Sequence, residues 1–387
     1  MSVWPTPVQE WILQSCFAPE REAGTALDSL ASQANAELDP ATARLAVLLY
    51  RRWPAFSHAI TATGREMYLV QWRENRERFA SMLEVAGRLR SRGIECLALK
   101  GAALVARHYR ELGLRGMRDF DLLVAEDDFE AAARELANAG YSAEDGYAPR
   151  DFERRKRTGH AWQFAREGVG CDLHWRPVVR CYAPEVTRLF WEGAETTAFG
   201  DGELRAPSAT DQLFHVCAHG LQWDWQPSVR WIADALTVLR EPVDWERVAR
   251  LARAARMRVR LAAALDYLKD RFGAPVPTEL AADLRREAPA WERREYACLL
   301  KPCPLGFRDS LWWHADHFRR IREFDSTWSS RAFCLGFVEY VARFLDADSA
   351  LDLWRRVKPA LQARERCLSR KPIPCPATIR FPSGRDQ

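Results

Sequence analysis

Two aspartates separated by one residue stand at the head of an apolar segment. Asp119 and Asp121 open the run that continues as Leu122, Leu123 and Val124. Alternate side chains of a β-strand point to the same face, so we expect the two carboxylates on one side, roughly 6.5–7 Å apart. Two such charges in an apolar setting are costly to bury without a cation between them. The spacing therefore predicts a divalent-metal site.

A third carboxylate lies in a later extended segment. Asp172 belongs to the sequence CDLHW, in which Asp172 and His174 share a face by alternation. If a sheet brings Asp172 beside Asp119 and Asp121, the three carboxylates can hold two Mg²⁺ or Mn²⁺ ions for phosphoryl transfer. Such ions activate an attacking hydroxyl and neutralise charge on the leaving oxygen. We expect Asp172 also to help deprotonate the acceptor.

A lysine and a glycine end the apolar run 94–99, where a strand is expected to give way to a helix. Gly101 would let the backbone approach a phosphate closely and would offer N–H groups of the helix start to it. Lys100, Arg115 and Arg118 would hold the remaining phosphate charge, with His174 lining the same site. These residues form the predicted nucleotide-binding set.

Each of these residues also has a purely structural alternative. The paired aspartates can cap neighbours at a strand end, Asp172 can pair with Arg176, and Lys100 can pair with Asp119. The arginines can be solvated charges, and His174 can be a hydrogen-bonded core residue. Three residues of the later helical segments, His219, Trp231 and Asp234, are interpreted as helix packing.

The elements that must position these residues follow from periodicity and turn signals. Helical spacing runs through the first ninety residues. Strands are predicted at 94–99 and 118–124, with a helix of about ten residues between them. Asp127 and Glu130 have capping-box spacing for a helix that ends at Gly140. Residues 161–166 and 169–175 are predicted to form a hairpin that turns at Glu167-Gly168. Helices are predicted from 208 to 365, and Ser208 is expected to cap the first of them.

The composition of the chain limits which cellular compartment and which binding partners are expected. The formal net charge of +4 permits a local basic groove and leaves a nucleic-acid partner open. The ten cysteines contain no CxxC pair, which is typical of a reducing compartment. The N-terminus lacks the pattern of a signal peptide, and no apolar run approaches the ~20 residues of a membrane span. A soluble cytoplasmic protein without a membrane partner is expected.

Several motifs together resemble a known family. The chain resembles the DNA polymerase β-type nucleotidyltransferase superfamily in the order of its motifs. A strand is followed by a glycine, a helix, a second strand that carries D-x-D, and a later strand that carries a third aspartate. The segments LALKGAAL, LRGMRDFDLLV, CDLHW, HVCAHG and VRWIADALTVL resemble more closely the uncharacterised nucleotidyltransferase-like family of bacteria, over roughly residues 30–350. In place of the usual Gly-Ser or Gly-Gly this chain has Gly101-Ala102, and Lys100 is a candidate substitute for the missing hydroxyl.

The resemblance implies an α+β protein with a small mixed β-sheet nucleotidyltransferase core. We expect a helical N-terminal domain at 1–93, the core at 94–200, a helical C-terminal domain at 201–365 that supplies the acceptor pocket, and a disordered tail at 366–387. The implied activity is metal-dependent transfer of a nucleoside monophosphate from an NTP, such as ATP, to an unidentified acceptor. A nucleotidyltransferase toxin that acts on tRNA or protein, using the basic run 154–157, and a catalytically silent nucleotide-binding module remain alternatives.

Overall fold

The structure is a computed structural model, and it describes residues 3–32, 38–143, 146, 152–153, 155–200, 202–222, 229–301, 307–325 and 333–344. Contacts divide the chain into two compact units, Met1–Leu299 and Leu300–Gln387. The first unit contains every candidate site residue. The second contains α15 (Phe307–Phe324) and α17 (Phe333–Phe344). The predicted tail and Arg154 of the basic run lie outside the described residues, and the finer division into domains stays a prediction.

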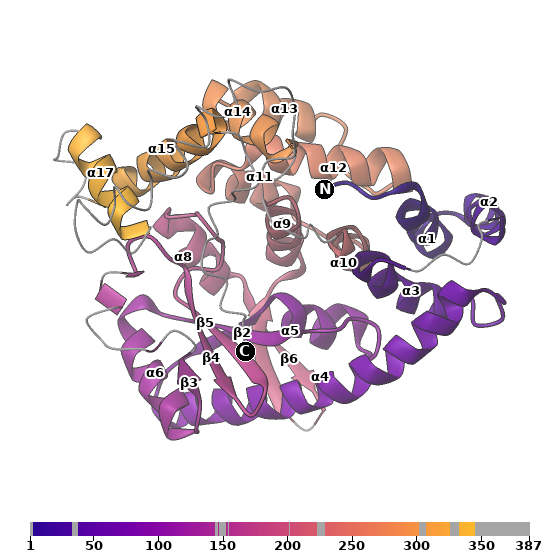
Figure 1. Ribbon diagram of the computed structural model, residues 1–387, viewed down its shortest axis with the longest axis horizontal. Coiled ribbons are helices and arrows are strands. Elements are labelled where there is room, and N and C mark those ends of the chain that lie inside the picture. The colour runs from indigo at the N-terminus through magenta and orange to yellow at the C-terminus, as the bar shows by residue number, and fades with distance from the viewer. Residues whose placement is uncertain are drawn as a thin grey trace, which may run out of the picture. The chain divides into compact units, whose positions relative to one another are not determined.

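Helices form the first ninety residues, as the periodicity predicts: α1 (Pro7–Phe17), α2 (Glu20–Ala31), α3 (Pro40–Arg52) and α4 (Ala59–Ser91). The side chain of Asp39 caps α3 by accepting from the N–H groups of Ala41 and Thr42. Helix α4 is long and runs beneath the sheet (Figure 1). Its buried Phe79, Met82 and Leu89 recur at helical spacing and pack on the strands.

A five-stranded mixed sheet forms the centre of the first unit. Its strands are β1 (Cys96–Leu99), β2 (Asp119–Val124), β3 (Ser142–Ala143), β4 (Ala161–Arg166) and β5 (Val169–His174), in the order β1-β2-β5-β4-β3. Strands β2 and β5 are parallel, and the other pairs are antiparallel. The expected α+β class with a small mixed sheet is thus confirmed. The β4–β5 hairpin turns at Glu167 and Gly168, whose φ angles of 52° and 82° suit a two-residue turn.

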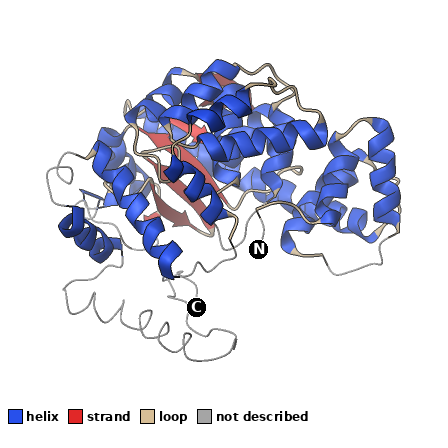
Figure 2. Cartoon of the chain, turned by 90° about the horizontal axis from the view of Figure 1, so that it is seen from above, coloured by secondary structure: helices blue, strands red, loops and turns tan. Residues whose placement is uncertain are grey.

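Alternation along the strands divides the core into two clusters. Leu122, Val124 and Leu173 face α4 and α6 (Phe129–Asn138). Leu99 and Leu123, of opposite parity, pack with the later helices, so the strands lie between helices on both sides (Figure 2). These later helices are α8 (Pro184–Glu192), α9 (Ala209–Gly220), α10 (Arg230–Val238), α11 (Trp245–Ala254), α12 (Arg258–Phe272), α13 (Leu280–Glu287) and α14 (Ala290–Leu299).

Several elements differ from the sequence prediction. The hairpin β6 (Ala194–Phe199) and β7 (Gly202–Pro207) was not predicted. The predicted helix of about ten residues after β1 is present, but only its first half, α5 (Lys100–Leu104), is α-helical, and it continues as the π-helix η1 (Val105–Tyr109). The predicted capping box of Asp127 and Glu130 is wrong, because the 3₁₀ turn η2 (Glu126–Asp128) precedes α6, which has no side-chain cap.

The predicted cap at Ser208 is confirmed, since its hydroxyl accepts from the Asp211 N–H at 3.2 Å.

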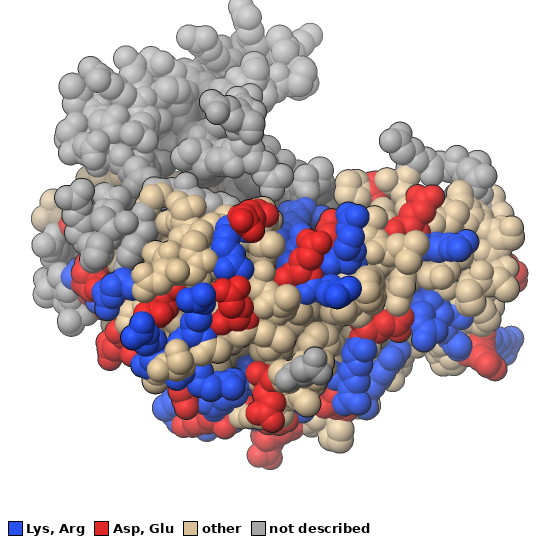
Figure 3. All heavy atoms as spheres, turned by 90° about the horizontal axis from the view of Figure 1, so that it is seen from below, with Lys and Arg blue, Asp and Glu red and all other residues tan. Residues whose placement is uncertain are grey.

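Charged side chains of both signs are interspersed on the side where α4 lies (Figure 3). Some of them pair within α4, as Glu74 does with Arg78 and Glu84 with Arg88. The described part of this face therefore presents no continuous field of one sign to a charged partner. Among the described helices, none has the length and apolar character that crossing a membrane requires.

Candidate functional site

The parallel pairing of β2 with β5 places Asp121 directly opposite Asp172. In the same register Leu123 lies opposite His174, so the two carboxylates and the imidazole share the face on which Leu123 packs. One ligand atom from each of Asp121, Asp172 and His174 lies within 4.8 Å of the others. Two strands predicted separately from sequence thus bring three potential metal ligands together.

Asp121 is the most buried of the carboxylates, at 2 % exposure, and it is fully compensated. Lys100 Nζ donates to its Oδ1 at 2.6 Å, and His174 Nε2 lies 2.9 Å from the same oxygen. Burial alone would raise the pKa of Asp121, but Lys100 and His174 hold it well below the usual range. Burial lowers the pKa of His174, so its imidazole is neutral at neutral pH. The alternative pairing of Lys100 with Asp119 is wrong, since the ammonium contacts Asp121.

Asp172 and Asp119 experience the opposite environment. Burial, followed by the charge of Asp121, raises the pKa of Asp172 to about 7 and also raises the pKa of Asp119. The alternative in which Arg176 neutralises Asp172 is wrong. Arg176 instead donates to the Gly159 carbonyl at 2.8 Å and pairs with Glu126 at 3.4 Å. Two of the three predicted carboxylates thus carry poorly compensated charge.

The donor set fits a divalent cation. Two adjacent carboxylates offer the oxygen ligands that Mg²⁺ and Mn²⁺ prefer, and an imidazole nitrogen is compatible with Mn²⁺. A cation would also relieve the repulsion that raises the pKa of Asp172. Asp119 lies two residues earlier on β2, opposite Gly170, and is outside the group of three.

Lys100 has a strained backbone at the strand-to-helix junction. Its φ of 44° lies in the left-handed region that non-glycine residues rarely adopt. The space beside Gly101 is filled by side chains, because a Cβ there would lie 2.5 Å from Arg115 Nη1 and 2.8 Å from Met117 Cγ. Glycine is therefore required for the approach of Arg115, whereas the sequence led us to expect phosphate in this space.

Among the described contacts, neither Arg115 nor Arg118 forms a hydrogen bond or ion pair with the three ligands, although Asp121 and Arg115 attract each other. Arg115 is buried against Asp234, with Nε 3.1 Å from Oδ1 and Nη2 3.1 Å from Oδ2, and Tyr109 donates to Asp234 at 2.8 Å. Arg118 is exposed, and its carbonyl accepts from Arg78 at 3.0 Å. Their roles in nucleotide binding stay predictions.

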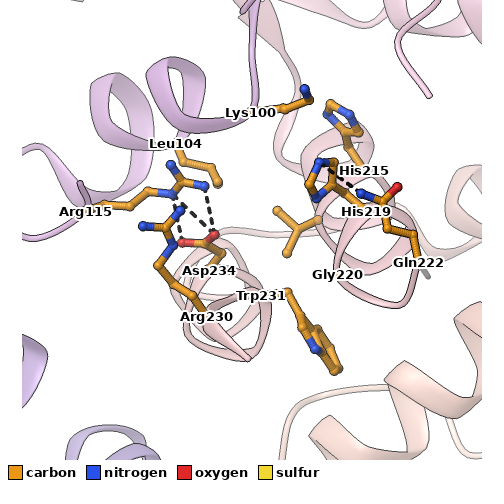
Figure 4. A pocket seen from close by; sticks show the side chains of 11 residues that line it. Lys100, Leu104, Arg115, His215, His219, Gly220, Gln222, Arg230, Trp231 and Asp234 are labelled. Atoms are coloured by element: carbon orange, nitrogen blue, oxygen red, sulfur yellow. Dashed lines mark hydrogen bonds and ion pairs between the residues drawn. The ribbon is translucent and has the colours of Figure 1, made fainter. Parts of the chain in front are cut away.

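A pocket next to Lys100 contains residues that were interpreted from the sequence as packing alone. It is lined by Arg115 and by side chains of α9 and α10, which Figure 4 shows converging from both sides. The residues from α9, α10 and the segment between them include His215, His219, Gln222, Arg230, Trp231 and Asp234. Trp231 is buried, as expected for packing, but His219 is exposed in the pocket. The spacing of His215 and His219, four residues apart on one helix face, was the available sequence signal.

The geometry matches what the sequence resemblance implies: a carboxylate pair on adjacent strands with a lysine at a neighbouring turn. No curated protein matches the chain. The chain does match the family described as uncharacterised nucleotidyltransferase over residues 42–273, which include the whole sheet and the pocket, and it belongs to that family.

Proposed function

We propose that the protein transfers a nucleoside monophosphate from an NTP to a hydroxyl or other nucleophile of an acceptor, with Mg²⁺ or Mn²⁺ as cofactor. The observation that carries this proposal is the convergence of Asp121, Asp172 and His174 on one face of the sheet. Family membership supports the same reaction class.

Asp121 and Asp172 would hold the cation, with His174 as a third ligand. The bound cation would polarise the α-phosphate and lower the pKa of the attacking hydroxyl. Asp119 would add negative charge at the end of β2, where the phosphates and the second cation of a two-metal site would bind. Asp172 would accept the proton of the acceptor, since a carboxylate at the edge of the cluster can exchange it with solvent.

Lys100 would bind phosphate oxygens. Its ammonium contacts Asp121 at 2.6 Å. When Asp121 shares its charge with a cation, the ammonium loses part of this attraction and can pair with the phosphates instead. The strained backbone of Lys100 fits a residue that is held in place for binding.

The test is transfer of label from α-labelled NTPs, with a cell extract as acceptor pool. Wild-type protein should label an acceptor and release pyrophosphate only when Mg²⁺ or Mn²⁺ is present. Asp121→Asn and Asp172→Asn should each abolish labelling, whereas Asp270→Asn, on the exposed end of α12, should not. ATP labelled at the γ-phosphate should label no acceptor, which distinguishes nucleotidyl transfer from a kinase reaction.

The same assay separates the alternatives. Label on tRNA or on a protein would favour the toxin-type reaction. Metal-dependent NTP binding without any labelled product would favour a silent nucleotide-binding module. Absence of metal-dependent NTP binding would refute the proposal.

A further inference from the structure

The pocket beside Lys100 has more positive than negative charge. Three of its lining residues are cations, Lys100, Arg115 and Arg230, and the one carboxylate among its described lining residues is Asp234. Lys100 is paired with Asp121, outside the pocket lining. Arg115 is paired with Asp234, which also accepts from Tyr109. These pairs give the first two cations a counter-charge each, and Arg230 remains.

Arg230 forms no ion pair with a carboxylate among the described residues, and the one carboxylate of the pocket lining, Asp234, is already paired with Arg115. It is the first residue of α10, it is partly buried, and its Nη1 donates to the Gly116 carbonyl at 2.8 Å. Burial, followed by the charge of Arg115, lowers the pKa of Arg230 to about 10. Asp234 also attracts Arg230, but this attraction is weaker than the repulsion by Arg115, so the two guanidiniums share a single carboxylate.

The rest of the lining can donate hydrogen bonds to an anion. Burial lowers the pKa of His215 well below its usual value, so its imidazole is neutral and retains an N–H group. His219 and Gln222 lie on the same side, with Gln222 Nε2 3.4 Å from His219 Nε2 (Figure 4). His215, His219 and Gln222 thus place hydrogen-bond donors across the pocket from Arg115 and Arg230 (Figure 4).

We infer that this pocket binds a phosphate-type anion and that Arg230 is its principal cation. A guanidinium presents a fork of N–H donors that matches the oxygens of a phosphate. The anion can belong to the phosphate tail of the NTP or to a phosphate group on the acceptor. This inference rests on the proposed function only for the identity of that carrier, because the pocket itself contains none of the three carboxylates of the metal site.

The test uses inorganic pyrophosphate as the probe, in isothermal titration calorimetry with the full chain and a chelator present. Wild-type protein should bind pyrophosphate, and Arg230→Gln should weaken binding at least about tenfold, as expected for loss of a charge-assisted contact. Arg230→Lys should retain part of the affinity. Arg240→Gln is the matched control, since Arg240 is exposed and packs over the ring of Phe17, outside the pocket.

A second readout excludes a merely structural role for Arg230. Without ligand, Arg230→Gln should melt at the wild-type temperature or above, because it removes a charge held against Arg115. A lower melting temperature together with unchanged pyrophosphate affinity would overturn the inference. Equal affinities of wild type and Arg230→Gln, or no binding by wild type, would also overturn it.

Competition identifies the carrier of the anion. If α,β-methylene-ATP with Mg²⁺ displaces pyrophosphate, the pocket takes the NTP tail, and if both bind together, the anionic group belongs to the acceptor. The pyrophosphate assay contains no metal and no NTP. It can therefore succeed when metal-dependent NTP binding fails, and the two proposals are tested separately.

Discussion

Replacing Asp172 or Asp121 by asparagine should change the stability of the metal-free protein in opposite directions. The two residues are neighbours on β5 and β2, and simple charge repulsion would predict the same effect for both. Their environments differ, however. Asp121 contacts Lys100 and His174, whereas at Asp172 burial and the charge of Asp121 outweigh the attraction of Lys100.

The size of the Asp172 effect follows from its pKa. The pKa rises from 3.8 to about 7 on folding, which corresponds to about 4 kcal/mol because one pH unit is worth about 1.36 kcal/mol. The folded protein keeps the proton up to about pH 7, while the unfolded chain releases it near pH 4. The free energy of unfolding therefore falls as the pH rises from about 4 to about 7 and is constant above that range. At pH 8, Asp172→Asn should raise the free energy of unfolding by up to about 4 kcal/mol, and at pH 4 it should leave this free energy almost unchanged.

Asp121→Asn should lower the free energy of unfolding instead. It removes the counter-charge of Lys100, and breaking one partner of a buried ion pair costs roughly 3–5 kcal/mol. The folded pKa of Asp121 is lowered, so its contribution is present above the unfolded pKa near 4 and is lost only as the pH falls below that value. The destabilisation should therefore be complete at pH 8.

Urea unfolding of both variants at pH 8 and pH 4.5, with a chelator, measures these effects. Asp270→Asn provides the baseline for the substitution itself. If Asp172→Asn lowers the free energy of unfolding at pH 8, or raises it equally at both pH values, the electrostatic account of the site is wrong. With Mg²⁺ or Mn²⁺ added in place of the chelator, wild type should gain stability and Asp172→Asn should gain less.

Three further substitutions test single contacts. Lys100→Asn removes the ammonium, while asparagine tolerates the φ of 44° at this position. Calorimetry should show that the binding free energy of the NTP is weakened by roughly 1.5–3 kcal/mol. Unchanged affinity would show that Lys100 does not bind phosphate. Gly101→Ala places a Cβ 2.5 Å from Arg115 Nη1 and should lower the free energy of unfolding by roughly 1–3 kcal/mol in urea unfolding, and an unchanged value would show that Arg115 does not require glycine there. Trp231→Ala should lower stability by roughly 3–5 kcal/mol, because the indole is buried; normal melting with lost turnover would assign it to the acceptor site instead.

The strands and the shared face of the aspartates were predictable because both depend on local sequence. Alternation fixes the relation of Asp119 to Asp121 and of Asp172 to His174 within each strand. The Glu167-Gly168 turn also follows from adjacent residues. Together with the family resemblance, these local patterns were enough to predict a small mixed sheet, whereas the shared role of Asp121 and Asp172 stays a prediction.

The partners of these residues could not be predicted, because they depend on packing between distant segments. The register that sets Asp121 beside Asp172 joins strands about fifty residues apart in sequence, and the Arg115–Asp234 pair joins residues 119 apart. Periodicity correctly placed Trp231 in the core, but it could not show that α9 and α10 also line a pocket beside Lys100. The β6–β7 hairpin escaped detection because half of the residues of its first strand are polar and half are exposed.

Lys100 lies at the boundary between two regions of opposite charge. On one side Asp119, Asp121 and Asp172 share one ammonium, and burial together with the charge of Asp121 raises the pKa of Asp172. On the other side the pocket has two guanidiniums, Arg115 and Arg230, and Asp234 is the one carboxylate among its described lining residues. A ligand that presents a divalent cation to the first region and an anion to the second would relieve both imbalances at once. A metal-bound polyphosphate has this distribution of charge, and so does a bound metal beside a separate anionic acceptor. The charges at Asp172 and Arg230 therefore destabilise the free protein at the place where the proposed substrates would bind. Removing either charge should stabilise the free protein and weaken binding of the substrate.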